Sequence, residues 1–232
     1  MTRRLILFDI DGTLLLSRGA GRRAILAAMA DLLRDDDRLA GVRFDGKTDP
    51  QIVMELLAAS GVDDPDEPGR IVEVLERYVG CLARELALPT HRTSLMPGVA
   101  DLLDRTERDD RAVLGLLTGN VAPGARLKLR SAALDPERFR VGAYGSDAAD
   151  RRLLPAIASE RARALFGRRP EGREVVIVGD TPADVLCGAA IGARAIGVAT
   201  GSYSVAELEA AGAAAVFLDL TDRDQVWQAI WS

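Results

Sequence analysis

The sequence predicts an α/β protein with a doubly wound parallel sheet and a smaller all-helical unit inserted after the first strand. From residue 97 onward, short apolar runs alternate with helical patterns, as expected for strands buried between two layers of helices. Between about residues 16 and 90, apolar residues recur only at helical spacing. We therefore expect an α/β core of residues 1–15 and 91–232, and a helical unit of residues 16–90.

Composition and charge disfavour several classes of function. The 232 residues include 48% hydrophobic and 28% charged residues, and the formal net charge is −5. A net negative charge disfavours nucleic-acid binding, and no apolar run approaches the ~20 residues of a membrane span. The two cysteines lie far apart at no metal-ligand spacing, which favours a reducing, cytoplasmic setting. The only histidine, His91, lies in a polar connector, so a Ser-His-Asp hydrolase or a His-rich zinc enzyme is disfavoured.

The first strand ends in two closely spaced carboxylates. The apolar run Leu5–Phe8 predicts a buried strand, and Asp9 and Asp11 follow it before the turn residues Gly12 and Thr13. Carboxylates at the end of a buried strand are costly to bury unless a cation compensates them. This stretch therefore indicates either a cation-binding site or a strand followed by an ordinary acidic turn.

Polar residues also follow two later strands. The predicted strand 112–117 ends in Thr118-Gly119-Asn120, which could present a hydroxyl and backbone N–H groups to an anion or could form a simple turn. The predicted strand 175–178 ends in Gly179-Asp180-Thr181-Pro182-Ala183-Asp184 and opens a helix. Because the carboxyl ends of parallel strands share one edge of the sheet, we expect these residues to lie near Asp9 and Asp11.

Periodicity and turn residues place the remaining elements. We expect further strands at 139–144, 195–198 and 214–218, and helices at 22–39, 49–60, 69–86, 98–106, 155–166 and 185–191 and from about 205 and 224. Asp49 and Pro50 are typical of an N-cap and a first helical residue. The acidic run 35–37 is expected to be a solvated helix end.

The string Asp9-Ile10-Asp11-Gly12-Thr13-Leu14, with the Thr-Gly-Asn and Gly-Asp-Thr-x-x-Asp segments after it, resembles the motifs of the haloacid dehalogenase superfamily. Most members are magnesium-dependent phosphatases with a Rossmann-like core. The helical unit resembles the cap of the phosphoglycolate phosphatase and β-phosphoglucomutase-like branch. The resemblance implies hydrolysis of a small phosphate monoester through an aspartyl-phosphate intermediate, with no nucleic-acid or membrane partner.

The resemblance also assigns roles to residues. Asp9 would be the nucleophile and Asp11 the general acid and base, with Thr118, Gly119 and Asn120 binding the phosphoryl group. The ligands of Mg²⁺ would be Asp9, Asp180 and the backbone carbonyl of Asp11, with Asp184 holding a metal-bound water or the basic residue.

The family places a lysine near the start of the helix after the predicted strand 139–144, where this chain has Arg151 and Arg152. We expect Arg151 to replace it, since Asp150 precedes it and a helix-start position aims it inward. Lys47 lies in the loop where related phosphatases place specificity residues, so it is a candidate substrate contact; the alternative is an exposed loop lysine.

Two other functions stay open. A phosphosugar mutase would use the same aspartyl-phosphate and pass it to another hydroxyl. A non-catalytic domain that kept the fold would explain the missing lysine. Neither the ester nor the oligomeric state can be predicted from the sequence.

Overall fold

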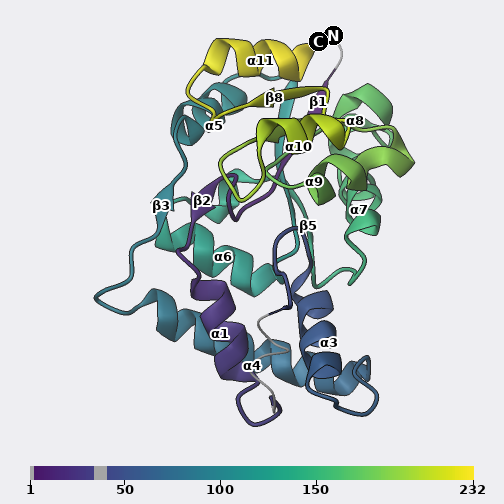
Figure 1. The fold of residues 1–232 in the computed structure, drawn as a ribbon. Coiled ribbons are helices and arrows are strands. Elements are labelled where there is room, and N and C mark those ends of the chain that lie inside the picture. The colour runs from purple at the N-terminus through teal and green to yellow at the C-terminus, as the bar shows by residue number, and fades with distance from the viewer. Residues whose placement is uncertain (1–2, 34–40) are drawn as a thin grey trace.

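The computed structural model describes residues 3–33 and 41–232 and has a six-stranded, all-parallel sheet at its centre (Figure 1). The first strand of the chain, β1, lies between β4 and β6 and is wholly buried. The predicted doubly wound fold is confirmed. The strands, in spatial order, are β5 (Val141–Tyr144), β4 (Ala112–Thr118), β1 (Arg4–Phe8), β6 (Val175–Gly179), β7 (Arg194–Val198) and β8 (Ala215–Phe217).

Both faces of the sheet are covered by helices because alternate side chains of each strand point to opposite sides. Ile6 and Phe8 of β1 pack in one apolar cluster, and Leu5 and Leu7 pack in another. The first cluster takes in α5 (Val99–Glu107), α6 (Ala122–Ser131) and α11 (Arg223–Trp231). The second takes in α7 (Leu154–Arg161), α8 (Arg163–Phe166) and α9 (Pro182–Cys187), while α10 (Val205–Ala210) packs on β7 and β8.

The segment between the first two motifs carries helices α1 (Ala20–Ala28), α3 (Asp49–Ala59) and α4 (Pro68–Leu86). Their apolar faces form a cluster of their own, to which the core contributes Val121. These helices lie at one end of the molecule, and the two chain termini lie together at the other end (Figure 1). We call this helical segment the cap; its exact limits, residues 16–90, remain a prediction.

The structure differs from the expected elements in four places. The helix expected at 22–39 is observed as α1, which begins at Ala20 and ends at Ala28. The acidic run 35–37 lies outside the described residues. Residue 48, not 49, caps α3: the Thr48 hydroxyl accepts a hydrogen bond from the Gln51 N–H. Leu15–Leu16 (β2) and Ser94–Leu95 (β3) form an antiparallel ribbon at the two cap–core crossings, too short to give a periodic signal. Helix α6 was not predicted at all.

No helix in the described part of the chain is both long enough and apolar enough to span a membrane.

Candidate active site

The two motif aspartates lie where β1 ends. The Asp9 N–H donates to the Val178 carbonyl of β6, at 3.0 Å, and Asp9 is only 7% exposed. The chain then turns at Gly12 with φ +83°, where a side chain would also collide with the Asp180 carboxylate. Only glycine allows both this conformation and this close approach.

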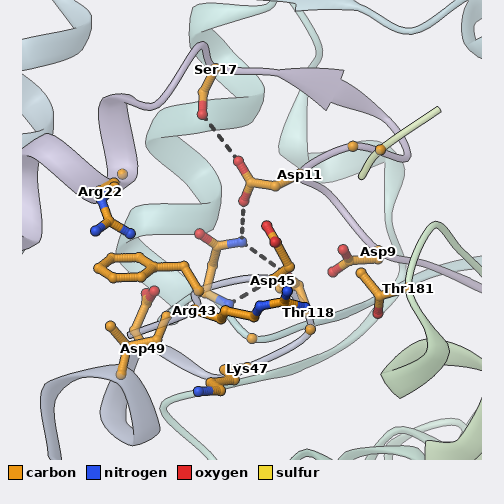
Figure 2. Close-up of a pocket in the computed structure, with 18 of the residues that line it drawn as sticks. Asp9, Asp11, Ser17, Arg22, Arg43, Asp45, Lys47, Asp49, Thr118 and Thr181 are labelled. Atoms are coloured by element: carbon orange, nitrogen blue, oxygen red, sulfur yellow. Dashed lines mark hydrogen bonds between the residues drawn. The ribbon is translucent and has the colours of Figure 1, made fainter. Parts of the chain in front are cut away.

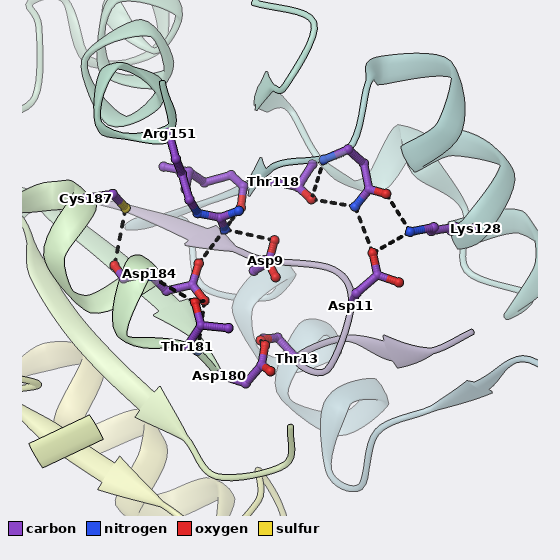
Figure 3. Close-up of polar contacts among 12 residues, drawn as sticks. Asp9, Asp11, Thr13, Thr118, Lys128, Arg151, Asp180, Thr181, Asp184 and Cys187 are labelled. Atoms are coloured by element: carbon purple, nitrogen blue, oxygen red, sulfur yellow. Dashed lines mark hydrogen bonds and ion pairs between the residues drawn. The ribbon is translucent and has the colours of Figure 1, made fainter. Parts of the chain in front are cut away.

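Three buried carboxylates, Asp9, Asp180 and Asp184, gather beside β1 and β6, with one oxygen from each within 4.8 Å of the others (Figure 3). Burial raises the pKa of Asp9 to about 6, against the opposing charge of Arg151. Burial and the charges of Asp184 and Asp9 raise the pKa of Asp180 well above its ordinary value. Three carboxylates whose charge is disfavoured by burial and by one another are a set of hard oxygen donors that fits Mg²⁺.

Arg151 places a positive charge against this cluster. It lies in the short 3₁₀ helix Arg151–Leu153 before α7, is 6% exposed, and pairs with Asp9 at 3.1 Å and with Asp184. These two carboxylates outweigh burial and raise the pKa of Arg151. Arg152 points away: its side chain is 80% exposed and pairs with Asp150. The structure thus places Arg151 beside the motif aspartates and leaves Arg152 at the surface.

Both oxygens of Asp184 already have partners. One oxygen pairs with Arg151, and the other accepts hydrogen bonds from the Thr181 N–H at 3.0 Å and the Thr181 hydroxyl at 2.7 Å. This is the capping box that opens α9. Asp180 is freer, since the only side chain that bonds it among the described residues is Thr13, at 2.8 Å. Of the two roles expected for Asp184, this arrangement matches holding the basic residue.

The Thr118-Gly119-Asn120 segment ends β4 next to the carboxylates. Thr118 is fully buried, and its hydroxyl accepts a hydrogen bond from the Asn120 side-chain amide at 2.8 Å. The cap loop presses on Gly119, where a side chain would strike the backbone carbonyl of Lys47. The Asp49 N–H donates to the Gly119 carbonyl at 2.7 Å, so this segment joins cap and core.

Asp11 is held by three groups, of which Lys128 is labelled in Figure 3 and Ser17 in Figure 2. The Lys128 ammonium lies 2.6 Å from one carboxylate oxygen, the Asn120 amide donates to the same oxygen at 2.9 Å, and the Ser17 hydroxyl donates to the other at 3.1 Å. Burial works to raise the pKa of Asp11, but Lys128 and the hydrogen bonds outweigh it and lower the pKa. Asp11 is therefore held as a carboxylate.

These groups surround a cavity of about 460 Å³ between cap and core (Figure 2). The core side contributes Asp9, Asp11, Thr118, Lys128, Arg151 and Asp180. The cap side contributes residues of α1, α3, α4 and the loop before α3, among them Arg22, whose guanidinium lies 4.5 Å from the Phe44 ring centre. The size suits a small molecule. Every expected site residue lines the cavity except Asp184, which lies behind Arg151; Lys47 lines it from the cap and the others from the core.

Comparisons with known proteins find the same fold. A family model described as HAD-hydrolase-like matches residues 154–223. A hydrolase from Pseudomonas syringae aligns over 100% of both chains at 21% identity and a TM-score of 0.72. CbbY from Rhodobacter sphaeroides, in complex with phosphate, aligns over 95% of this chain and 96% of its own at 23% identity and a TM-score of 0.73. A predicted phosphoglycolate phosphatase from Haemophilus somnus 129PT aligns over 98% and 99% at 19% identity and a TM-score of 0.70.

The chain has the haloacid dehalogenase-like fold. The resemblance expected from the sequence is confirmed for this fold and for the segment that the family model matches. No curated protein matches the sequence significantly.

Lys128 is a residue of the candidate site that the sequence analysis missed. It is 5% exposed and comes from α6, a helix that was not predicted. A signal was available: Lys128 is one of only two lysines in the chain, and it lies between Leu127 and Leu129 on a helix that begins with Ala-Pro-Gly. A lysine among apolar neighbours indicates a buried partner of opposite charge.

The other lysine, Lys47, lines the cavity, but its ammonium pairs with Glu55 of α3. The pair is partly exposed, with 24% of the Lys47 side chain accessible. In Figure 2, Lys47 lies apart from Asp9 and Asp11. Its role as a substrate contact therefore stays a prediction.

We expect Lys47→Ala to raise KM by no more than about fivefold and to leave kcat unchanged, because a partly exposed ion pair is worth ~0–1 kcal/mol. Steady-state kinetics on each accepted ester measure this, with Glu55→Gln as the variant that releases the lysine from its partner. A KM change above tenfold in Lys47→Ala alone would show that the ammonium binds substrate directly.

Proposed function

We propose that this protein is a magnesium-dependent phosphatase that hydrolyses a small phosphate monoester through an aspartyl-phosphate on Asp9. The observation that carries the proposal is the convergence of five residues on one wall of the cavity: Asp9, Asp11, Thr118 and Asp180 from the ends of neighbouring strands, and Arg151 from the short helix before α7. Phosphoryl transfer depends on positioning and charge stabilisation more than on covalent chemistry, and these groups supply both.

In the first step, an Asp9 carboxylate oxygen attacks phosphorus and the ester P–O bond breaks. Asp11 gives a proton to the leaving alkoxide oxygen. In the second step, water attacks the aspartyl-phosphate; Asp11 removes the proton from this water, and Asp9 is released with inorganic phosphate. The contacts of Asp11 with Lys128, Asn120 and Ser17 suit the second step, since they favour the carboxylate. The first step requires that Asp11 take up a proton against them.

Arg151 and Thr118 are the protein groups best placed to bind the phosphoryl oxygens beside Asp9. Arg151 presents a planar guanidinium that suits two oxygens at once. Asp9 and Asp180 would hold Mg²⁺, which when bound neutralises phosphoryl charge and orients the phosphate. Asp184 then acts on Arg151, whose guanidinium it holds in place.

Release of inorganic phosphate from phenyl phosphate tests the proposal. We expect turnover with MgCl₂ and a loss of roughly 10³-fold or more with EDTA, since a catalytic metal is worth several kcal/mol of transition-state stabilisation. A mutase would instead convert one sugar phosphate into its isomer with little phosphate release. A protein that releases no phosphate from a broad panel of esters in MgCl₂ is not a phosphatase.

Metal binding has its own readout. Because Mg²⁺ would bind only the folded cluster, it should raise the melting temperature of the wild-type protein. Asp180→Asn should abolish this shift, whereas Asp101→Asn, which alters an exposed residue of α5, should keep it. An equal Mg²⁺ shift in wild type and Asp180→Asn would exclude Asp180 as a ligand.

A further inference from the structure

One buried hydroxyl in the cap faces the cavity without a partner. Tyr78 of α4 is 0% exposed, and its ring lies in the apolar cluster of the cap. Tyr78 is among the residues that line the cavity, yet its hydroxyl makes no hydrogen bond with any of the described residues. Burying a hydroxyl without a hydrogen bond is unfavourable, and a phenylalanine would fill the same space without that cost. The hydroxyl therefore calls for a partner that enters the cavity.

Gly21 of α1 shows which groups share this space. A methyl group added to Gly21 would lie 3.1 Å from the Lys128 nitrogen and 3.7 Å from the Tyr78 oxygen. The two polar groups thus face the same small volume, which Gly21 leaves free of side-chain atoms. Lys128 has three N–H groups, of which Asp11 and Asn120 take two. The third bonds none of the described residues and can bond a ligand.

Asp49 completes the polar lining. One of its oxygens accepts from the Val121 N–H at 2.8 Å, and the other accepts nothing from the described residues. The side chain is 6% exposed and lines the cavity together with Ile25 and Ile52. Besides burial, the charges of Asp49 and Asp11 raise the pKa of Tyr78, which shows that the phenol lies within their field. The lining offers two donors and one acceptor between apolar walls.

Tyr78, Lys128 and Asp49 together favour some alcohol parts of a phosphate ester over others. A hydroxyl group can donate one hydrogen bond to Asp49 and accept bonds from Tyr78 and Lys128. A carboxylate can only accept, so it would leave the free Asp49 oxygen without a donor and add a negative charge beside Asp49 and Asp11. An alkyl or aryl group would leave the Tyr78 hydroxyl, the third Lys128 N–H and the second Asp49 oxygen without a partner.

We propose that Tyr78, Asp49 and Lys128 form a subsite that binds a hydroxyl group on the alcohol part of the phosphate ester, next to the oxygen that Asp11 protonates. The inference rests on the proposed function and names its substrate class: a polyol or sugar phosphate, in preference to an alkyl, aryl or carboxylate-bearing ester. Contact between Lys128 and Asp11 places the subsite immediately beside the leaving oxygen.

Glycerol 1-phosphate and propyl phosphate test the subsite, since they differ only in two hydroxyl groups. We expect the wild type to prefer glycerol 1-phosphate in kcat/KM, both over propyl phosphate and over 2-phosphoglycolate. Tyr78→Phe should lower the glycerol-to-propyl preference about tenfold, the usual order for one lost hydrogen bond, without lowering the melting temperature. Tyr144→Phe, on β5 and outside the cavity lining, is the matched control and should keep the preference.

Filling the space tests the same inference without removing a polar group. Gly21→Ala should raise KM for glycerol 1-phosphate at least fivefold while keeping the melting temperature, because alanine favours a helix. Gly80→Ala in α4 is its control, since the added methyl would meet only the Arg84 guanidinium, at 3.8 Å. An unchanged preference in Tyr78→Phe, or a wild type that prefers propyl phosphate or 2-phosphoglycolate, would overturn the subsite.

A binding measurement separates this inference from the proposed function. Calorimetry on Asp9→Asn, which cannot form the aspartyl-phosphate, should show tighter binding of glycerol 1-phosphate than of propyl phosphate. Adding Tyr78→Phe should remove that difference. If the wild type hydrolyses neither ester but this binding difference appears, the function fails and the subsite stands. If esters are hydrolysed without the difference, the subsite fails alone.

Discussion

The Asp9→Asn protein should release no measurable phosphate from any ester that the wild type hydrolyses. An amide cannot attack phosphorus to form the covalent intermediate, so the whole nucleophilic route is lost. We expect at least a 10⁵-fold loss of kcat, more than 6 kcal/mol at the transition state. A malachite-green assay at high enzyme concentration in MgCl₂ measures it.

The fold should survive this change. Asp9 is 7% exposed among other carboxylates, and burial already raises its pKa to about 6, so the site accommodates an uncharged group. Arg151 keeps its pair with Asp184 in the variant. We expect the melting temperature of the metal-free variant to equal or exceed that of the metal-free wild type. A folded Asp9→Asn protein that retains magnesium-dependent turnover would assign the nucleophile to another residue.

The core could be predicted because its signals are local. β1, β4 and β6 are short apolar runs, and each ends in a polar motif that marks the carboxyl edge of the sheet. Gly12 shows why the first motif can be recognised from the sequence. Its positive φ and its close approach to Asp180 permit only glycine at this position. Such constraints act within a few residues, so they leave a record in the sequence.

Other parts of the site depend on packing between distant segments. Lys128 meets Asp11 from 117 positions away, and this requires α6 to lie across the end of β1. Tyr78 fits the apolar helical spacing of α4, so the sequence alone indicates a core residue. Only the structure shows that Tyr78 also lines the cavity. The ribbon of β2 and β3 has two residues per strand, too few for any period.

The choice between Arg151 and Arg152 could be predicted only in part from the sequence. The sequence narrowed the replacement for the family's lysine to two adjacent residues, and the favoured position is the buried one. Asp150 accepts a hydrogen bond from the Arg152 N–H at 2.9 Å, which starts the short helix and turns the two side chains apart. This N-terminal cap therefore determines that Arg151, and not Arg152, is the buried arginine.

Arg151→Ala should impair both stability and catalysis. Removing the guanidinium leaves Asp9 and Asp184 buried and unpaired, and breaking a buried ion pair in this way typically costs ~3–5 kcal/mol of unfolding free energy. The lost contact to the phosphoryl oxygens should lower kcat/KM by roughly 10³-fold, about 4 kcal/mol. Denaturant unfolding and steady-state kinetics measure the two losses separately.

The companion variants decide what the arginine does. Arg151→Lys restores the charge but not the planar fork, so it should recover most of the stability and only part of kcat/KM. Arg152→Ala removes a side chain that is 80% exposed and should change the unfolding free energy by less than ~0.5 kcal/mol and leave turnover intact. If Arg151→Lys regains stability but no activity, two-oxygen binding by the guanidinium is essential. If Arg151→Ala matches the wild type in both measurements, the charge that balances the phosphoryl group comes from elsewhere, and the proposed arrangement of the site is wrong.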